Sequence, residues 1–231
     1  MVSKIISEAR LYPIVEKWMK KHFQCFQTSK NTGLRHGRID VLGVRDVGGD
    51  LSGDVETISI EVKRGTEPFA TASGQALGYK IYANRVYLAD VRSDSFSHEE
   101  IKIASHLGIG LIQIKHGKCT EVLTSPFYFP MTSLNLRILE RLALGKCQIC
   151  SSFFETGKVK EMRKGFTSYV TKENLEKALQ ENKGMVFWNY EVADRKEKMK
   201  IRNRGNYDTF ERRYICPECV KIFFSKYSDK D

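Results

Sequence analysis

Two carboxylates and a lysine on neighbouring predicted strands have the residue types that phosphate chemistry requires. Asp40 lies in a run rich in β-branched residues, and Glu61 and Lys63 lie on either side of Val62 in a second such run. Residues i and i+2 of a strand point to the same face, so Glu61 and Lys63 share a face. If the two runs pair as an antiparallel hairpin, Asp40 lies beside Glu61 and the three charged groups meet in one pocket.

Such a pocket would suit the hydrolysis of a phosphodiester. Neighbouring carboxylates repel each other unless a cation neutralises them, and hard divalent ions such as Mg²⁺ prefer oxygen ligands and keep several waters. The amine of Lys63 could then orient or deprotonate an attacking water and stabilise charge on the phosphate. The alternative is a surface ion pair on an ordinary strand, and the short motif alone does not decide between the two.

Four of the six cysteines form two Cys-x-x-Cys pairs, Cys147 with Cys150 and Cys216 with Cys219. Two such pairs have the spacing of a tetrahedral Cys₄ zinc site, which has no open ligand position and is therefore structural. The segment 151–215 would then be an insertion between the two halves of the site. A redox role for a Cys-x-x-Cys pair is the alternative, but the presence of two pairs favours metal.

The elements that must position the three charged residues follow from periodicity and turn signals. Apolar spacing predicts a helix over residues 5–23 that Pro13 interrupts, and the polar segment 28–37 is expected to be a loop. Ser97 and Glu100 have the spacing of a capping box at a helix start. The other expected elements are helices over 67–83 and 97–107 and strands over 38–45, 57–63, 85–89, 109–114 and 120–123, the last two joined by a turn at 116–117. This order predicts an α/β fold with a mixed sheet and helices on both faces.

The chain, with 231 residues, is long enough for one large domain or two small ones. A segment with two prolines and several aromatics predicts a boundary that separates domain 1–125 from domain 126–231. The second domain is expected to contain helices over 133–144, 172–180 and 220–227 and a strand over 185–192. No stretch has the roughly 18 consecutive apolar residues of a membrane span, and the N-terminus lacks a secretory apolar run, so a cytosolic protein is expected.

The net charge is +10, from 38 Lys and Arg against 28 Asp and Glu, and most of the basic excess follows residue 130. Basic proteins bind polyanions because phosphate contacts release counterions, so nucleic acid is the expected partner. A solvated charged face is the alternative. The side chains expected to contact DNA are Lys158, Lys160, Arg163, Lys164, Arg195, Lys196, Lys198, Lys200, Arg202 and Arg204.

Residues 5–125 resemble the PD-(D/E)XK nuclease superfamily, which has the restriction-endonuclease-like fold. The resemblance rests on Asp40, the triplet 61–63, a preceding helix that carries Glu8, and the run Gln75-Ala-Leu-Gly-Tyr79 on the following helix. One departure is that Ile39, not proline, precedes Asp40. The family core also requires a third antiparallel strand, which would be hidden in the hairpin region.

The resemblance implies specific roles. Asp40, Glu61 and the backbone carbonyl of Val62 would hold Mg²⁺ (or Mn²⁺), and Lys63 would be the catalytic lysine. Gln75 would help to position the lysine, the water or the DNA backbone. Glu8 would supply a further acid, with Glu16 as its competitor on the same helix.

The resulting hypothesis is a Mg²⁺-dependent DNA endonuclease, of restriction type, with a small zinc-stabilised C-terminal domain that grips or selects DNA. Holliday-junction resolution or repair cleavage is the second choice, and RNA cleavage is a distant third. Two alternatives are not enzymes: a catalytically silent DNA-binding protein on the nuclease fold, and a structural α/β module. Double-strand cleavage needs two active sites, so restriction-type activity would imply a homodimer.

Overall fold

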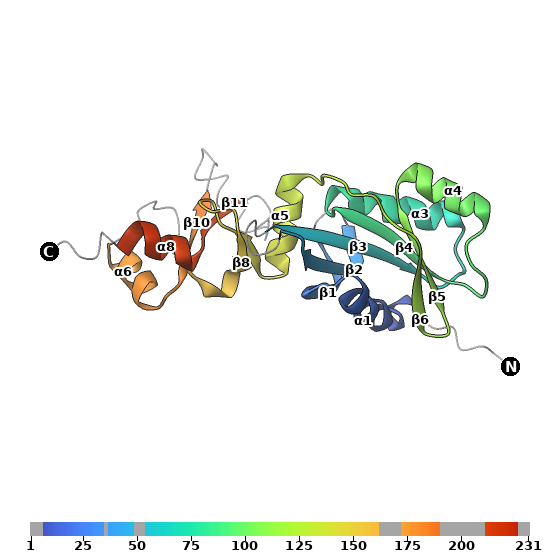
Figure 1. Ribbon diagram of the computed structural model, residues 1–231, viewed down its shortest axis with the longest axis horizontal. Helices are drawn as coiled ribbons and strands as arrows, with labels where there is room; N and C mark the ends of the chain where they lie inside the picture. Colours follow the sequence, from blue (N-terminus) through green and yellow to red (C-terminus); the bar gives the residue numbers. More distant parts are fainter. Residues whose placement is uncertain (1–6, 35–36, 49–53, 162–171, 190–210, 226–231) are drawn as a thin grey trace, which may run out of the picture. The chain divides into compact units, whose positions relative to one another are not determined.

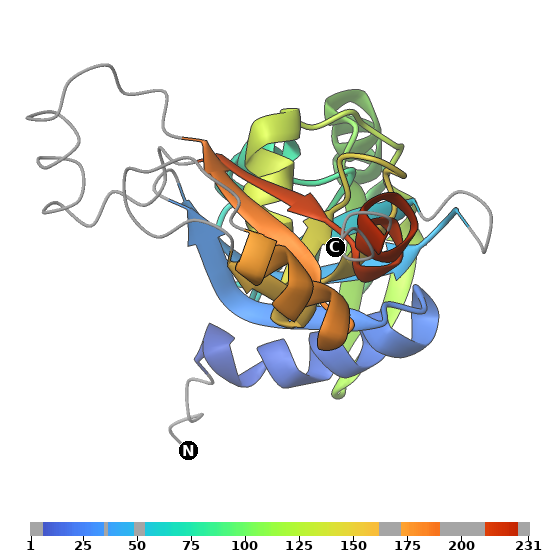
Figure 2. The ribbon, with the colours of Figure 1, turned by 90° about the vertical axis from the view of Figure 1, so that its left-hand side faces the viewer.

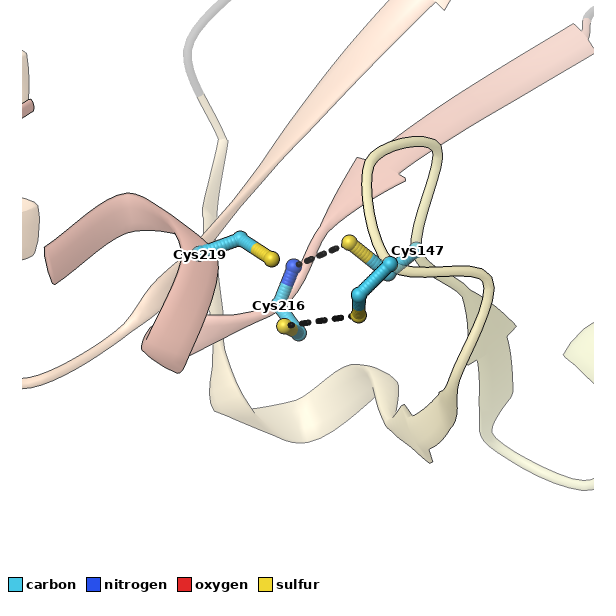
Figure 3. Close-up of side chains that lie close together, drawn as sticks. Cys147, Cys216 and Cys219 are labelled. Carbon is cyan, nitrogen blue, oxygen red and sulfur yellow. Dashed lines mark hydrogen bonds between the residues drawn. The ribbon is translucent and has the colours of Figure 1, made fainter. Parts of the chain in front are cut away.

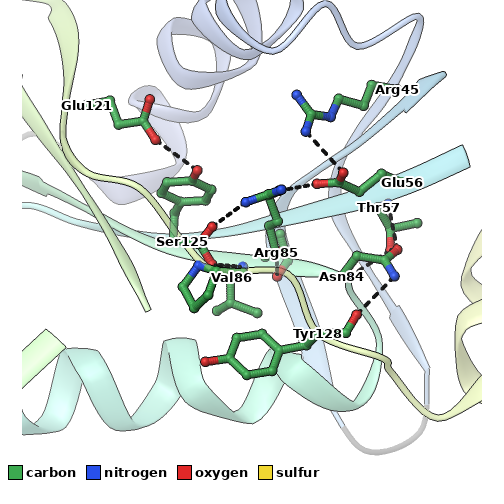
Figure 4. Close-up of polar contacts among 12 residues, drawn as sticks. Arg45, Glu56, Thr57, Asn84, Arg85, Val86, Glu121, Ser125 and Tyr128 are labelled. Carbon is green, nitrogen blue, oxygen red and sulfur yellow. Dashed lines mark hydrogen bonds and ion pairs between the residues drawn. The ribbon is translucent and has the colours of Figure 1, made fainter. Parts of the chain in front are cut away.

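The computed structural model describes residues 7–34, 37–48, 54–161, 172–189 and 211–225. The chain divides into two compact units: unit 1 comprises residues 1–49 and 55–142, and unit 2 comprises residues 50–54 and 143–231. The sequence placed the boundary after residue 125, but residues 126–142 belong to unit 1. They are held there by hydrogen bonds, such as the one that the Asn84 side chain donates to the Tyr128 carbonyl (Figure 4).

Unit 1 is built on a six-stranded mixed sheet whose strands lie in the order of the sequence, β1-β2-β3-β4-β5-β6 (Figure 1). β3, β4 and β5 run parallel, and every other neighbouring pair is antiparallel. The predicted mixed α/β class is confirmed. The strands are β1 (Gln27–Leu34), β2 (Gly37–Asp46), β3 (Val55–Lys63), β4 (Arg85–Val91), β5 (Gly110–Lys115) and β6 (Lys118–Leu123).

Helices cover both faces of this sheet (Figure 1). α3 and α4 connect successive parallel strands, and right-handed crossovers place both helices on the same face. α1 covers the opposite face, where Val15 and Met19 share one buried cluster with Val41, Ile58 and Ile60. The helical elements are η1 (Glu8–Arg10), α1 (Tyr12–His22), α3 (Phe69–Gly78), η2 (Tyr79–Ile81), α4 (His98–Leu107) and α5 (Thr132–Arg141).

The edge strand β1 lies where the sequence predicted a loop, so that prediction is wrong. Most of its residues are polar, and they form a strand because their backbone pairs with β2, from Gln27 opposite Val44 to Leu34 opposite Gly37. An edge strand needs no apolar alternation, which explains why periodicity missed it. A Cβ at Gly33 would meet the Gly37 carbonyl oxygen, so glycine allows the close approach of the two strands.

Local signals at two helices are confirmed. The predicted interruption near Pro13 separates η1 from α1, and the proline lies in the first turn of α1, where its missing N–H costs no hydrogen bond. α4 begins with the predicted capping box: the Glu100 N–H donates to Ser97 Oγ, and the Ser97 N–H donates to the Glu100 carboxylate. The turn between β5 and β6 has positive φ at His116 and Gly117.

Unit 2 contains a three-stranded sheet in the order β11-β10-β9 and a hairpin of β7 and β8. Figure 2 shows α6 and α8 beside β10, and Ala178, Met185 and Val220 form the buried cluster between them. Helix α8 begins three residues earlier than predicted, at Pro217. The elements are β7 (Leu144–Lys146), β8 (Phe153–Glu155), η3 (Thr156–Lys158), β9 (Val159–Glu161), α6 (Lys172–Gln180), β10 (Gly184–Asn189), β11 (Glu211–Ile215) and α8 (Pro217–Phe224). Among the described residues of both units, no helix has the length and apolar character needed to cross a membrane.

Candidate functional site

Asp40, Glu61 and Lys63 line one cavity of about 360 Å³ in unit 1. The predicted antiparallel pairing of their strands is confirmed, with Val41 opposite Ile60, and this register places Asp40 beside Glu61. Glu61 and Lys63 lie at the carboxyl end of β3, the kind of sheet edge at which α/β folds bind ligands. The cavity, called the site cavity below, is lined by Glu8, Gly37, Arg38, Asp40, Glu61, Lys63, Gln75, Gly78, Tyr79 and Tyr82.

Both carboxylate oxygens of Asp40 accept hydrogen bonds. The Tyr12 hydroxyl donates to Oδ1 at 2.6 Å, and the Val62 N–H donates to Oδ2 at 2.9 Å. Burial, the hydrogen bond to Asp40 and the negative charge of Asp40 raise the pKa of Tyr12, so its hydroxyl stays protonated and donating. Val62 contacts Asp40 through its backbone N–H, and the expected role of its carbonyl as a metal ligand stays a prediction.

Glu61 is only 5% exposed, which is unusual for a carboxylate. The Tyr79 hydroxyl donates to Glu61 Oε2 and lies 2.7 Å from the Arg38 carbonyl oxygen, so one proton serves two acceptors. Burial raises the pKa of Glu61, the hydrogen bonds from Lys63 and Tyr79 lower it, and the charge of Asp40 raises it again, with a net upward shift. The negative charge of Asp40 thus adds to the effect of burial on Glu61, and Lys63 at 2.8 Å offsets part of both.

Lys63 is also 5% exposed and is surrounded by carboxylates. Its Nζ lies 2.8 Å from Glu61 Oε1, 3.4 Å from Glu67 Oε2 and 4.0 Å from Glu8 Oε1. Burial lowers the pKa of Lys63, but the hydrogen bond and charge of Glu61, together with Glu8 and Glu67, raise it above its ordinary value. Lys63 is therefore an ammonium ion at neutral pH.

The remaining predicted residues of this site separate into those at the cavity and those away from it. Glu8 and Gln75 line the cavity. Glu16, the competitor of Glu8, instead accepts a hydrogen bond from Thr28 and pairs with Lys30 at 3.1 Å.

The sequence missed Tyr12 and Glu67 as members of the site. Tyr12 is four residues after Glu8, which is a weak signal of a shared helical face. Nothing in the sequence indicated Glu67, because it meets Lys63 across the turn between β3 and α3.

The four cysteines of the two Cys-x-x-Cys pairs come together in unit 2, as predicted (Figure 3). Their sulfur atoms lie within 4.8 Å of one another, and Cys150 Sγ is 3.7 Å from Cys216 Sγ. A tetrahedral site with Zn–S bonds of about 2.3 Å places neighbouring sulfurs about 3.8 Å apart, so the cluster has the dimensions of a metal site.

Backbone amides hold this cluster in place. Cys147 Sγ accepts hydrogen bonds from the Ile149 N–H at 3.4 Å and the Cys216 N–H at 3.3 Å. Cys150 is exposed and the other three cysteines are buried. Burial and the neighbouring cysteine side chains raise the pKa of Cys219. The cluster can therefore hold a metal ion such as zinc.

The predicted DNA contacts lie mostly outside the described residues. Lys158 is exposed and lies 3.5 Å from Glu155 in an ion pair, and Lys160 lies in β9. The other eight are beyond the described part of the chain: Arg163, Lys164, Arg195, Lys196, Lys198, Lys200, Arg202 and Arg204.

Comparison with known proteins identifies no family. No model of a protein family matches the chain, and a search of curated proteins gives no match. Among solved structures, the chain is similar to the SPO1766 protein of unknown function from Silicibacter pomeroyi. The two sequences are 20% identical, the match covers 60% of this chain and 86% of that chain, and the TM-score is 0.45.

Proposed function

We propose that this protein is a metal-dependent DNA endonuclease with a restriction-endonuclease-like core, and that it cleaves in the restriction manner. The observation that carries the proposal is the meeting of Asp40, Glu61 and Lys63 in one cavity at the carboxyl end of β3. A net charge of +10 supports a polyanionic substrate. The resemblance to PD-(D/E)XK nucleases supports the reaction class.

Asp40 and Glu61 fit a hard divalent cation, because both offer carboxylate oxygens to the same cavity from facing strands. They would hold Mg²⁺ (or Mn²⁺), with the carbonyl of Val62 as a third protein ligand. When bound, the ion would lower the pKa of a water and stabilise negative charge on the phosphate.

The side chains around the carboxylates have positioning roles. Tyr12 and Tyr79 fix the orientation of Asp40 and Glu61 through their hydroxyl groups. Lys63, held as an ammonium by its carboxylate neighbours, is suited to stabilise charge on the phosphate and to orient a water, and unsuited to remove a proton from it. Gln75, exposed on α3 at the cavity, would contact the water or the DNA backbone.

The test is cleavage of supercoiled plasmid in Mg²⁺ by the wild-type protein, Lys63→Ala and the matched control Lys115→Ala, an exposed lysine of β5. Nicked or linear products from the wild type and the control, lost in Lys63→Ala and on withholding Mg²⁺, are expected. If Lys63→Ala does not fold, Lys63→Arg takes its place in the test, because arginine keeps the positive charge.

Other outcomes distinguish the alternatives. Intact plasmid with cleaved four-way junctions would favour the resolvase or repair function. Intact plasmid together with a persistent gel shift would replace the enzyme with a catalytically silent DNA-binding protein.

For unit 2, we infer that the four clustered cysteines bind one structural zinc ion, which stabilises a domain that would engage DNA. A Cys₄ site leaves no position for a water, and metal binding would add stability to a unit with a small buried cluster. Elemental analysis should find one zinc per chain in the wild type and in the control Cys119→Ser. Cys216→Ser and Cys219→Ser should lose it, and a metal-free wild-type chain after growth with zinc would contradict the inference.

A further inference from the structure

The acidic and basic side chains that line the site cavity do not balance one another. Lys63 has three carboxylates within 4.0 Å, so its positive charge is already balanced inside the protein. Three carboxylates line the cavity, from Glu8, Asp40 and Glu61. Before a divalent cation binds, a phosphodiester that enters meets a surplus of negative charge, which a positive side chain beside Asp40 would offset.

Among the residues that the structure describes, Arg38 is the other cationic side chain that lines the cavity. It is two residues before Asp40 in β2, so both side chains lie on the same face of the sheet. Arg38 is exposed, and within the part of the chain that the structure describes its guanidinium has no hydrogen bond or ion pair. Every other arginine of the sheet strands of unit 1, Arg45 and Arg85, pairs with Glu56.

The backbone of Arg38 is fixed to the site. The Tyr79 hydroxyl that donates to Glu61 lies 2.7 Å from the Arg38 carbonyl oxygen, so one phenol links the arginine's main chain to the buried carboxylate. A guanidinium on a fixed backbone offers two parallel N–H donors, which match two oxygens of a phosphate.

The helix beside the cavity leaves room for a large ligand. Gly74 and Gly78 are exposed, lie one turn apart on α3, and would place a Cβ with nothing within 4 Å. Glycine in a helix lowers helix stability by about 1 kcal/mol relative to alanine. No packing contact requires a glycine at position 74 or 78, because a Cβ would fit at both. The bare surface next to Gln75 and Arg38 suits a polymer backbone better than an enclosed small molecule.

We propose that Arg38 binds the substrate phosphodiester at the site cavity and adds its positive charge to that of Lys63, which carboxylate neighbours already offset in part. The proposal rests on the nuclease function above and names the group that recognises the substrate. Loss of Arg38 should weaken substrate binding and raise KM, since the carboxylates and Lys63 remain in place.

The test is binding of a fluorescent DNA duplex, without Mg²⁺, as a function of salt concentration. The variants are Arg38→Ala, Arg38→Lys and the control Arg64→Ala, an exposed arginine that follows Lys63 and does not line the cavity. One lost phosphate contact should reduce the slope of log K against log salt by about 1. Arg38→Ala should show this reduction, Arg38→Lys should keep most of the slope, and Arg64→Ala should match the wild type.

Cleavage measured in parallel separates this proposal from the proposed function. If the wild type cleaves DNA and Arg38→Ala binds and cleaves it unchanged, the role of Arg38 is overturned and the nuclease function stands. If neither the wild type nor any variant cleaves DNA, but Arg38→Ala still reduces the slope of log K against log salt, the phosphate contact stands and the nuclease function fails. Absence of DNA binding by the wild type would overturn both.

Discussion

Replacing Asn84 with alanine should destabilise unit 1, because this side chain closes a buried polar network at the amino end of β3 (Figure 4). Asn84 is 9% exposed and Thr57 is fully buried. Asn84 Oδ1 accepts hydrogen bonds from the Thr57 N–H at 2.9 Å and the Thr57 hydroxyl at 2.8 Å. Its Nδ2 donates to the Tyr128 carbonyl at 3.1 Å.

The expected loss follows from what the substitution leaves behind. The buried Thr57 N–H would have no acceptor, which costs about 1–3 kcal/mol, and the lost bond to the Tyr128 carbonyl adds about 1 kcal/mol. The free energy of unfolding should therefore fall by about 3 kcal/mol. Asn135 is a useful comparison, because its Nδ2 only donates, to Thr57 Oγ1 at 2.9 Å and to the Tyr82 carbonyl at 2.7 Å. Asn135→Ala removes no acceptor from a buried N–H and should cost less.

Urea unfolding followed by tryptophan fluorescence measures this difference. The chain has two tryptophans, and in a Trp188→Phe background the remaining Trp18, packed on the core of unit 1, reports on that unit. Lys102→Ala, an exposed side chain of α4, is the control and should stay within about 0.5 kcal/mol of the parent. The reasoning would be refuted if Asn84→Ala lowered the free energy of unfolding by less than about 1 kcal/mol, or if Asn135→Ala lowered it by more than Asn84→Ala.

Two further predictions concern the end of β3. Burial raises the pKa of Glu61 in the folded protein above its value in the unfolded chain. As pH rises through the raised pKa, Glu61 ionises in its buried position and the free energy of unfolding falls, by about 1.4 kcal/mol for each unit of the pKa shift. Glu61→Gln cannot ionise, so without added Mg²⁺ its free energy of unfolding minus that of the wild type should increase from pH 4.5 upward. If urea titrations give the same difference at every pH from 4 to 8, the prediction is wrong. Gly65 has φ of +77°, and a Cβ there would meet the Val91 carbonyl oxygen, so Gly65→Ala should lower the unfolding free energy by about 1–3 kcal/mol. An unchanged urea midpoint for Gly65→Ala would show that this turn tolerates a side chain.

The strands that position the site could be predicted because their sequences carry their own signal. β2, β3 and β4 are runs of buried β-branched and apolar residues, with 0% exposure at Val41, Ile60 and Val86. β1 could not be predicted, since an edge strand gains its hydrogen bonds from β2 and leaves polar side chains in solvent. The domain boundary was placed too early because aromatics and prolines also occur in segments, such as 126–131, that hydrogen bonds tie to Ile81 and Asn84 of unit 1.

The site was predictable only where spacing along one element determines geometry. Glu61 and Lys63 share a face by strand alternation alone, and Asp40 joins them through a register that two facing strands fix. The contact between Tyr12 and Asp40 depends instead on where the first turn of α1 meets the end of the sheet, which no local pattern encodes. The same is true of Glu67, which reaches Lys63 across an irregular turn.

The burial of Glu61 and Lys63 decides against the simplest alternative, a surface ion pair on an ordinary strand. Each is 5% exposed, so both charges have lost most of their hydration, and apolar residues of similar size would stabilise such a position equally well or better. Two tyrosine hydroxyls and a backbone N–H are then required to satisfy the oxygens of Asp40 and Glu61. This arrangement stabilises the fold less than apolar packing would, and it lines a cavity instead of a closed core. Costly charged groups at a cavity favour a functional role over a structural one, which is the physical reason for testing this site first.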